Sequence, residues 1–459
     1  MRRFLVWTTL GVLATSLAAP GALNAQGYSV NEHSSCATGR AGTGVASPCS
    51  DGSAIVYNPA GLASLAKGAG TFAIGGTFIA PSGNFTDDAT GIVSKMNSKV
   101  YPVPAVYLTR GLTNTVAAGI GLFAPYGLTT DWPTTSQGRF LGYHTVIHTI
   151  YVQPTVAAKL GQRMKVGGGL DVNFAHVQLR QRVDLSTQLV GAPAPPGVTF
   201  GNLGIPNGTD FADVNLHANA TGIGYHLGLM VEATDRISFG VRYLSRQKVT
   251  FKSGNVDISE VSTGILLPAS NPFGVPGGTP LDALLASQFA AGGPLTNQTA
   301  TTALRFPEQW VVGTTLKPTD QLQLFFDVQY THWEVFKSLD IAFQRLPVVI
   351  LPENFRNVTA YRFGGQYDVT PATSLRLGYI SHDAAEPDGS VVPNLPEGRR
   401  SEFTLGVGTR LTNRIHGDVA YQYIDQGDRR GRTVPAGQPD NGLYHFNAHI
   451  FGATLAFDF

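Results

Sequence analysis

The sequence predicts an all-β fold, a transmembrane antiparallel β-barrel of about 14 strands. Polar and apolar residues alternate with a period of two along many segments, for example over 322–330, where Leu, Leu, Phe, Val and Tyr share one face. The connections alternate between tight turns and long loops, which is typical of a barrel that crosses an outer membrane. The chain ends on a strand whose Phe451, Leu455 and terminal Phe459 share one face.

The composition agrees with one large β-domain that enters a membrane. The chain has 459 residues, including 54 Gly, 25 Phe and 16 Tyr, but only 14% are charged and the net charge is +1. This weak charge argues against nucleic acid as a partner. After the N-terminal region, no apolar run is long enough for a helix to span a bilayer, so a closed barrel is the structure that can cross it.

The N-terminal residues have the pattern of an export signal. Two arginines precede an apolar run at 4–19, which is followed by the small residues Ala22 and Ala25. The run is shorter than the ~20 apolar residues that a membrane-spanning helix needs. We therefore interpret 1–25 as a signal peptide cleaved after Ala25, and expect the mature protein in the outer membrane of a Gram-negative bacterium.

The connections set the predicted strand boundaries. A soluble sandwich would also show alternation, but its connections would be of similar length at both ends, whereas here short and long ones alternate. An even number of strands places both chain ends on the same side of the membrane. The predicted strands cover 70–80, 99–109, 114–124, 143–160, 163–181, 219–234, 236–253, 304–317, 320–336, 358–369, 373–383, 400–411, 414–425 and 443–459.

Several motifs, taken in order, carry a resemblance to a known family. They are Tyr-Asn-Pro-Ala-Gly-Leu at 57–62, Ala-Pro-Tyr-Gly-Leu-Thr-Thr at 124–130, Phe-Pro-Glu-Gln-Trp at 306–310, Thr-His-Trp-Glu-Val-Phe at 331–336 and Leu-Pro-Glu-Gly-Arg-Arg at 395–400. With them, nearly the whole mature chain resembles the FadL/TodX family of outer-membrane channels for hydrophobic compounds. The terminal Phe459 also resembles the signal that the barrel-assembly machinery reads.

The resemblance implies that residues 26–68 fold as a hatch inside a barrel of residues 69–459. It also implies that Asn58, Pro59 and Ala60 help to hold this hatch.

The residues themselves permit this role. Pro59 removes a backbone donor, and Gly52 and Gly61 favour turns, so the segment would make a poor wall strand. Ile55 and Leu62 give it apolar side chains that can pack inside the lumen. The alternative is a disordered N-terminal tail.

A lateral gate is also implied by the resemblance. In the family the third strand kinks and leaves a gap in the wall, and the matching strand here is 115–124. Its Gly119 and Gly121, together with the following Pro125, weaken packing and interrupt a ladder of hydrogen bonds. Glycine is also common in ordinary barrel strands.

The candidate substrate-binding residues lie near this strand, in the fifth strand and on a long loop. His176 matches loosely the place where the family carries a basic side chain for a carboxylate, and it would favour a neutral hydrocarbon or aromatic substrate. The alternative is an ordinary histidine at the rim of the lumen. The candidates are Phe123, Tyr126, Phe174, His176, Leu281, Leu284, Leu285 and Phe289.

The loop candidates belong to a predicted helix at 279–289. Thr279 is expected as its cap, Pro280 at the first helical position and Asp282 in the first turn. The leucines and Phe289 then form one apolar face. Such a face either packs on a neighbouring loop or forms a groove that captures substrate.

Cys36 and Cys49 are the only cysteines, and both lie in an exported segment, so a disulfide between them is predicted; two free thiols are the alternative. No metal site is expected, because His144 and His148 would lie ~13 Å apart along a strand. No cofactor motif and no catalytic motif such as G-x-S-x-G is present.

Taken together, these features predict a channel for passive uptake of hydrophobic small molecules such as long-chain fatty acids or hydrocarbons, and not an enzyme. Transport would have three steps. The extracellular loops capture the substrate, the lumen binds it, and a gap at the third strand releases it laterally into the outer-membrane lipid. A surface adhesin or structural barrel is the alternative from another class. An outer-membrane lipid hydrolase is the third reading.

Overall fold

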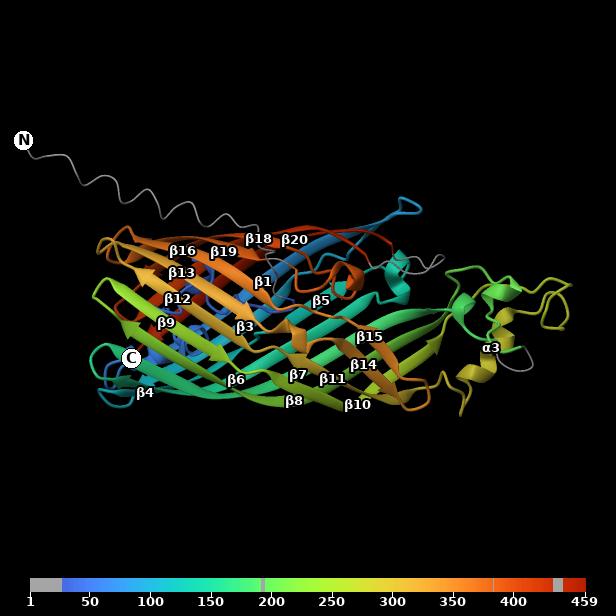
Figure 1. The fold of residues 1–459 in the computed structure, drawn as a ribbon, viewed down its shortest axis with the longest axis horizontal. Coiled ribbons are helices and arrows are strands. Elements are labelled where there is room, and N and C mark those ends of the chain that lie inside the picture. Colours follow the sequence, from blue (N-terminus) through green and yellow to red (C-terminus); the bar gives the residue numbers. More distant parts are fainter. Residues whose placement is uncertain (1–26, 191–194, 383, 432–440) are drawn as a thin grey trace, which may run out of the picture.

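The chain folds as a closed antiparallel β-barrel of 14 strands, which confirms the predicted fold class (Figure 1). The computed structural model describes residues 27–190, 195–382, 384–431 and 441–459. The predicted signal peptide, 1–25, lies outside the described residues. Among the residues that are described, no helix is both long enough and apolar enough to cross a membrane.

The wall closes where β20 pairs with β1, from Thr71–Asp458 to Asp87–Gly442. Two consecutive segments share one wall position in four places: β4 with β5, β9 with β10, β11 with β12, and β13 with β14. The strands of the wall are β1 (Gly70–Asp87), β3 (Tyr101–Gly111), β4 (Val116–Phe123), β5 (Gly127–Asp131), β6 (His144–Leu160), β7 (Met164–Asp184), β8 (Asp210–Glu232), β9 (Ile237–Leu244), β10 (Gln247–Glu260), β11 (Gln298–Phe306), β12 (Gln309–Leu316), β13 (Leu322–Thr331), β14 (Ser338–Phe343), β16 (Val358–Asp368), β17 (Thr373–His382), β18 (Arg400–Arg410), β19 (Ile415–Arg430) and β20 (Gly442–Asp458).

The remaining elements are short. β2 (Val93–Lys95) pairs with the end of β1, and β15 (Val349–Pro352) pairs with β14. The helices are α1 (Ser35–Thr38), α2 (Ala54–Tyr57) and α3 (Leu281–Phe289), and the 3-10 turns are η1 (Pro59–Ser64), η2 (Gln137–Phe140), η3 (Leu185–Thr187), η4 (Gly201–Leu203), η5 (Trp333–Val335) and η6 (Asp388–Ser390).

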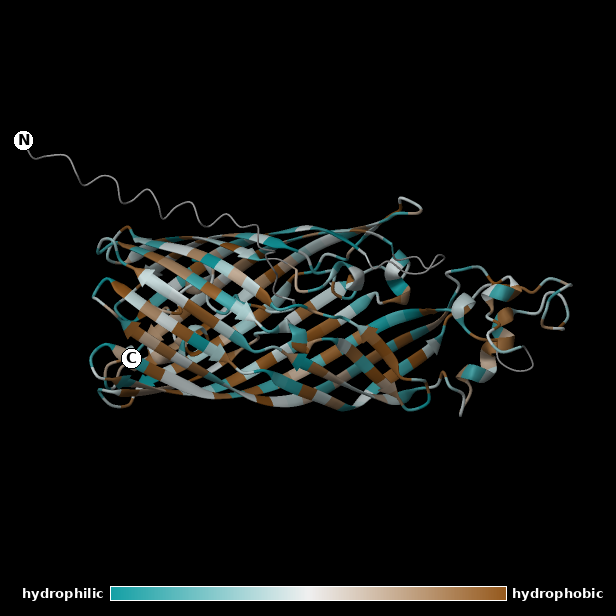
Figure 2. Ribbon diagram, viewed as in Figure 1, coloured by the Kyte–Doolittle hydropathy of each residue, from teal (hydrophilic) through white to brown (hydrophobic). Residues whose placement is uncertain are grey.

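The two faces of the wall differ as a membrane barrel requires. In β13, Leu324 is 43% exposed on the outer face, whereas Asp327 and Gln329 are buried on the inner face. The same alternation gives the banded hydropathy of the strands in Figure 2. Apolar residues therefore face outward toward lipid, and polar residues face the lumen.

The two ends of the barrel also differ. One end carries short turns and the C-terminal Phe459, whose backbone N–H donates to the carbonyl of Gly70 at 2.9 Å. The other end carries the long loops, and α3 lies in the loops that extend beyond the wall (Figure 1). Several strands run further toward this end than predicted; β8 begins at Asp210 instead of residue 219.

The N-terminal segment, residues 27–68, contacts the inner face of the wall on several sides. Glycines of the wall make room for it, because a Cβ on Gly167 of β7 would lie 2.5 Å from the carbonyl carbon of Pro59. On β18, a Cβ on Gly406 would lie 2.8 Å from the Cα of Gly39. The backbone of the segment is thus packed directly against the backbone of the barrel. Within the segment, Cys36 and Cys49 form a disulfide with their Cα atoms 6.3 Å apart.

Candidate binding cavity and a break in the wall

Asn58 is the centre of the contacts that hold the N-terminal segment. Its fully buried side-chain nitrogen donates to the carbonyl of Val45 at 2.6 Å and to the carbonyl of Leu229 on β8 at 3.0 Å. Its side-chain oxygen accepts the N–H of Ala60 at 3.1 Å. Pro59 opens η1, a position where its missing N–H leaves no hydrogen bond unmade. One amide therefore ties the segment both to itself and to the wall.

Other strands hold the segment through polar side chains. On β13, the carboxylate of Asp327 accepts the N–H groups of Gly44 at 2.9 Å and Val45 at 3.1 Å. On β18, the hydroxyl of Thr404 accepts the N–H of Ala41 at 3.0 Å. Buried donors of the segment therefore find acceptors on opposite sides of the barrel, which fixes its position.

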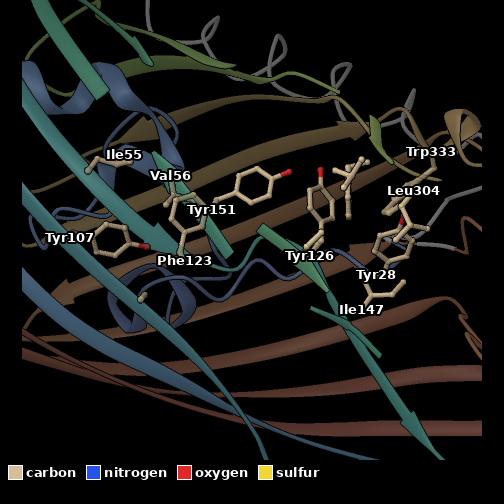
Figure 3. Close-up of a cluster of buried hydrophobic side chains, with 14 of the residues drawn as sticks. Tyr28, Ile55, Val56, Tyr107, Phe123, Tyr126, Ile147, Tyr151, Leu304 and Trp333 are labelled. Atoms are coloured by element: carbon tan, nitrogen blue, oxygen red, sulfur yellow. The ribbon is translucent and has the colours of Figure 1, made fainter. Parts of the chain in front are cut away.

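An aromatic cluster surrounds the beginning of the segment (Figure 3). The ring of Tyr28 lies 4.7 Å from that of Trp333 and 6.1 Å from those of Tyr126 and Phe306, all in edge-to-face contact. Tyr126 also donates its hydroxyl to the carbonyl of Pro307 at 3.0 Å. These contacts bring the three motifs at 124–130, 306–310 and 331–336 together around one residue of the N-terminal segment.

The ladder of the wall is interrupted between β3 and β5. Pairing of β3 with β4 ends at Val106–Leu122, and β5 has no pairing with β3. On the other side, β6 pairs with β4 up to Phe123 and resumes with β5 at Gly127. Three residues of the interrupted strand, 124–126, thus lie opposite two of β6, which is a β-bulge.

The N-terminal segment supplies the hydrogen bonds that β3 does not. Val30 donates its N–H to the carbonyl of Pro125 at 2.9 Å, and Gly127 donates to the carbonyl of Tyr28 at 3.0 Å. From β6, the hydroxyl of Thr149 donates to the carbonyl of Tyr126 at 2.7 Å. The backbone at the break is therefore satisfied from inside the barrel while the adjacent edge of β3 stays unpaired.

The break, at residues 124–126, lies further along the strand than the two glycines that were predicted to form it. Gly119 and Gly121 stand in the fully paired part of β4. A Cβ on Gly121 would lie 3.1 Å from Cγ2 of Ile55, so this glycine makes room for the N-terminal segment. Of the three predicted gate residues, Pro125 alone lies within the break.

A cavity of about 330 Å³ lies at this break. Its walls include inward-facing Val103 and Leu128 and also Pro102 and His148, which face outward. The lining thus passes from one face of the barrel to the other. The further apolar lining comes from Val30, Ile79, Met96, Pro104, Ile150, Leu395, Phe446, Ala448 and Ile450.

The carboxylates and the guanidinium of the cavity lie at its inner side. They include the carboxylates of Glu32, Glu397 and Glu402 and the guanidinium of Arg400, whose Nε donates to Gln426 at 3.1 Å. Burial and the charge of Glu402 raise the pKa of Glu32. The cavity therefore has an apolar body with one charged edge.

The predicted binding residues divide between three places. Tyr126 lines the cavity, and Phe123 is buried next to it against the rings of His33 and Tyr151. Contrary to the expectation from the sequence, Phe174 and His176 lie on the outer face of β7, because the alternate positions Asp171 and Asn173 are the buried ones. The side chain of His176 bonds Asn219 of β8 at 2.9 Å.

The loop helix forms as α3, but it begins one residue later than predicted. Pro280 is its N-cap, and the hydroxyl of Thr279 donates to the carbonyl of Pro276 instead of capping. Leu281 and Leu285 are buried in a loop cluster, with Leu284 and Phe289 packed against it. The apolar face of the helix therefore packs on the loops. The buried members of this cluster are Leu185, Phe200, Ile205, Phe211, Ala212, Leu216, Val256, Ile258, Leu267, Leu281, Leu285, Leu295, Ala300 and Ile341.

Most residues of the cavity lining were not predicted as site residues, and four of them show why. Pro102 and Pro104 lie in β3 where one edge has no partner strand, and two prolines in one strand are the signal that marks such an edge. Glu397 and Arg400 were noted only as part of a motif. The inward direction of Arg400 follows from the parity of β18. That of Glu397, which precedes the strand, follows from its bonds to Gly27 and to the backbone of Ala385.

These features define the class of the protein. A barrel with an apolar outer face, a segment packed in its lumen and a largely apolar cavity at a break in the wall is typical of outer-membrane proteins that bind apolar compounds. In the described part of the chain, no three His, Cys, Asp or Glu side chains are placed to hold a metal ion.

The particular family follows from comparison. Residues 16–459 match the family described as outer membrane protein transport protein (OMPP1/FadL/TodX), and the chain belongs to this family. Its members are transport proteins and not enzymes. The chain is 26% identical over 426 residues to the 47 kDa outer membrane protein of Pasteurella multocida, covering 91% of each. It is 24% identical over 457 residues to the long-chain fatty acid transport protein of Escherichia coli K12, covering 94% of each.

Solved structures share the fold. A FadL homologue from Pseudomonas aeruginosa superposes with a TM-score of 0.75 at 19% identity, covering 94% of this chain and 99% of that one. The toluene transporter TodX from Pseudomonas putida gives a TM-score of 0.67 at 16% identity, with 95% and 99% covered. At these identities the likeness concerns the architecture of the barrel.

Proposed function

We propose that this protein takes up hydrophobic small molecules passively across the outer membrane, with long-chain fatty acids or neutral hydrocarbons as the substrate class. A molecule binds in the cavity at the break and leaves sideways between β3 and β5 into the lipid. The observation that carries this proposal is the lining of the cavity, which includes side chains of both faces of the wall, such as Val103 and Pro102.

The magnitude of the hydrophobic effect favours the sideways route. An apolar chain of about a dozen methylenes gains ~10 kcal/mol on leaving water. Release from an apolar cavity into the aqueous periplasm would require this free energy to be given back. Release into the membrane exchanges one apolar surrounding for another, so it has no such barrier.

In this scheme the N-terminal segment acts as a hatch below the cavity, and the domain division is a hatch followed by the barrel of 69–459. The hatch blocks straight passage because Asn58, Asp327 and Thr404 fix it to the wall. Its Tyr28 and Val30 also hydrogen bond Gly127 and Pro125 at the bulge. The terminal Phe459 serves recognition by the barrel-assembly machinery, and the apolar outer face contacts membrane lipid.

Initial capture belongs to the long-loop end of the barrel. The apolar loop cluster around α3 supplies a surface of the required character, although Leu281 and Leu285 themselves are covered. Capture therefore involves the half-buried Leu284 and Phe289 more than the buried positions.

Uptake by Gram-negative cells that lack a channel of this family tests the proposal. A radiolabelled fatty acid and a neutral hydrocarbon are supplied to cells producing the wild type, Ala448→Trp or Ala453→Trp. Ala448 is buried and lines the cavity, whereas Ala453 faces outward from the same strand. We expect Ala448→Trp to lose uptake of both compounds, because the new ring fills the cavity, while Ala453→Trp behaves as the wild type.

The same cells separate the alternatives. If the wild type gives no uptake above cells without the protein, the barrel is not a channel for these compounds, and an adhesin role must replace it. Release of free fatty acid from phospholipid by the purified protein would favour a hydrolase.

A further inference from the structure

The outer face of the wall carries a group of basic side chains on β10 and β11. Lys248, Lys252 and Arg305 are exposed there, and they form what we call the basic group. In the register of the two strands, Lys248 lies directly opposite Arg305. Two like charges at directly opposite positions on one face destabilise the pairing of the strands. An anion bound to both side chains would remove this repulsion.

The protein itself does not neutralise the basic group. In the described part of the chain, none of its three cations forms an ion pair. Glu308 lies 3.9 Å from Arg246 and 3.3 Å from His332, and Asp257 lies 3.6 Å from His217. The acidic residues of β10, of the link between β11 and β12 and of β14 are Asp257, Glu260, Glu308 and Asp340.

The height of the basic group on the wall corresponds to the membrane surface. Tyr243 of β9 lies opposite Trp310 of β12, and their ring centroids are 4.5 Å apart. Tyrosine and tryptophan on the outer face of a barrel mark the boundary between lipid tails and headgroups. From this aromatic pair, β10 and β11 continue toward the long loops, where α3 lies (Figure 1). The basic group therefore lies at the level of the headgroups of the outer leaflet.

The wall steps inward beside the basic group. The pairing of β8 with the strand formed by β9 and β10 is interrupted over residues 218–224 of β8. There Val249 packs on the inner face of β8, because a Cβ on Gly222 would lie 2.6 Å from Cγ2 of Val249. The next residue of β8, Ile223, faces outward and is 73% exposed. An exposed apolar side chain thus borders the lysines of β10.

We propose that Lys248, Lys252 and Arg305 bind the phosphate groups of a phosphorylated glycolipid in the outer leaflet of the outer membrane. The two lysines are about 13 Å apart along β10, so the site contacts more than one phosphate of the same headgroup. The acyl chains lie on the apolar band, beginning at Ile223 and Trp310. β6, β7 and β8 separate this site from the break between β3 and β5, so the proposal does not rest on the proposed transport.

Native mass spectrometry of the purified protein tests the proposal. Protein in a non-ionic detergent is titrated with doubly phosphorylated lipid A or with the same lipid after enzymatic removal of its phosphates. We expect the phosphorylated form to bind at least about tenfold more tightly, because each basic side chain near an anionic lipid surface contributes about fivefold. Millimolar inorganic phosphate at constant ionic strength should not displace the lipid, since the acyl chains also hold it to the wall.

Variants assign the binding to the basic group. Lys248→Gln combined with Lys252→Gln should bind lipid A about tenfold more weakly or worse. The matched control is Lys67→Gln combined with Lys317→Gln, which removes the same charge from exposed lysines at the short-turn end and should bind like the wild type. Compact migration of unheated protein on a gel verifies that each barrel is folded.

A melting measurement separates lipid binding from folding. Without lipid, Lys248→Gln should melt at or above the temperature of the wild type, because it removes the like charge opposite Arg305. With lipid A, the wild type should gain more stability than the variant, since a ligand of the folded state stabilises in proportion to its occupancy. A lower melting temperature of the lipid-free variant would mean that Lys248 serves the fold and would contradict the proposal.

The proposal is overturned if both forms of lipid A bind equally, if the Lys248 and Lys252 double variant binds like the wild type, or if inorganic phosphate displaces the lipid. The comparison of the two lipids uses the wild type alone, so it decides the question even where a variant does not fold. Substrate uptake is not measured, so the result is independent of the proposed transport.

Discussion

Single side chains fix the position of the N-terminal segment in the lumen, and Asn58 contributes most to this. Its amide makes three donor contacts, to the carbonyls of Val45, Leu229 and Val241, and one acceptor contact to Ala60. All of these groups are shielded from water, so each needs a partner within the protein. The position therefore requires a side chain that donates and accepts at once.

Asn58→Ala should loosen the segment while the barrel persists. Removing the amide leaves buried groups unpaired at a cost of roughly 1–3 kcal/mol. We expect faster hydrogen exchange over residues 41–62, measured by mass spectrometry. Asn202→Ala is the matched control, because Asn202 bonds only within an exposed loop turn. Unchanged exchange over 41–62 would show that Asn58 does not hold the segment.

At the residue scale, the sequence predicts chemical character better than direction. Asn58 and Tyr126 were found through motifs: Asn58 lies where the segment meets the wall, and Tyr126 lines the cavity. Phe174 and His176 were assigned to the lumen, but one step along a strand reverses the side that a residue faces. The parity of β7 is set by the buried Asp171 and by Gly167 beneath Pro59, contacts that form only in the folded barrel.

The element that matters most for function is the interrupted strand formed by β4 and β5. Its glycines accommodate the N-terminal segment, and its break lies at 124–126. A proline at 125 suggested the interruption in advance. Residues 28–30 replace β3 as the hydrogen-bonding partner at the break. They are about a hundred residues away in the sequence, so a local pattern does not predict this contact.

Gly121→Phe should therefore displace the segment instead of filling the gap. The new ring would meet Ile55 and Tyr107, whose atoms lie 3.1 Å and 3.2 Å from the Cβ position. Overpacking of this kind costs typically about 1–3 kcal/mol. We expect faster hydrogen exchange over 52–58. Gly76→Phe, at an open position on the lipid-facing side of β1, should leave it unchanged. If Gly121→Phe exchanges like the wild type, Ile55 does not rest on this strand.

The loop helix α3 leads to a prediction about stability. Leu285 is 2% exposed and contributes to the loop cluster, whereas Ala286 is exposed. Leu285→Asp buries a carboxylate without a partner and should make residues 261–297 sensitive to limited proteolysis, with the barrel intact. Ala286→Asp should resist as the wild type does. Equal resistance of both variants would mean that the cluster does not depend on α3.

The helix also shows why elements are easier to predict than their partners. Its composition and spacing predicted a helix close to the observed bounds. Whether its apolar face would pack or remain open was undecided, because the answer lies in Phe211, Val256 and Ile341, which come from three strands far apart in the sequence.

At the scale of the whole molecule, alternation, loop asymmetry and an even strand count were enough to predict the barrel. These features repeat along the chain, so an error in one strand does not change the predicted fold. The cavity was not predictable in the same way, since it is the place where the repetition fails. The cavity forms where β3 has no neighbouring strand and the N-terminal segment makes the backbone hydrogen bonds instead.

The most direct test of the account is to close the mouth of the break from outside. Pro102 faces outward and lines the cavity, whereas Pro154 faces outward in the paired part of β6, so Pro102→Trp and Pro154→Trp form a matched pair. We measure uptake of an apolar compound by cells, with binding to the purified proteins by native mass spectrometry. The account predicts that Pro102→Trp binds the compound but does not support uptake above background, while Pro154→Trp does both. If folded Pro102→Trp transports as well as the wild type, the compounds do not leave through the wall.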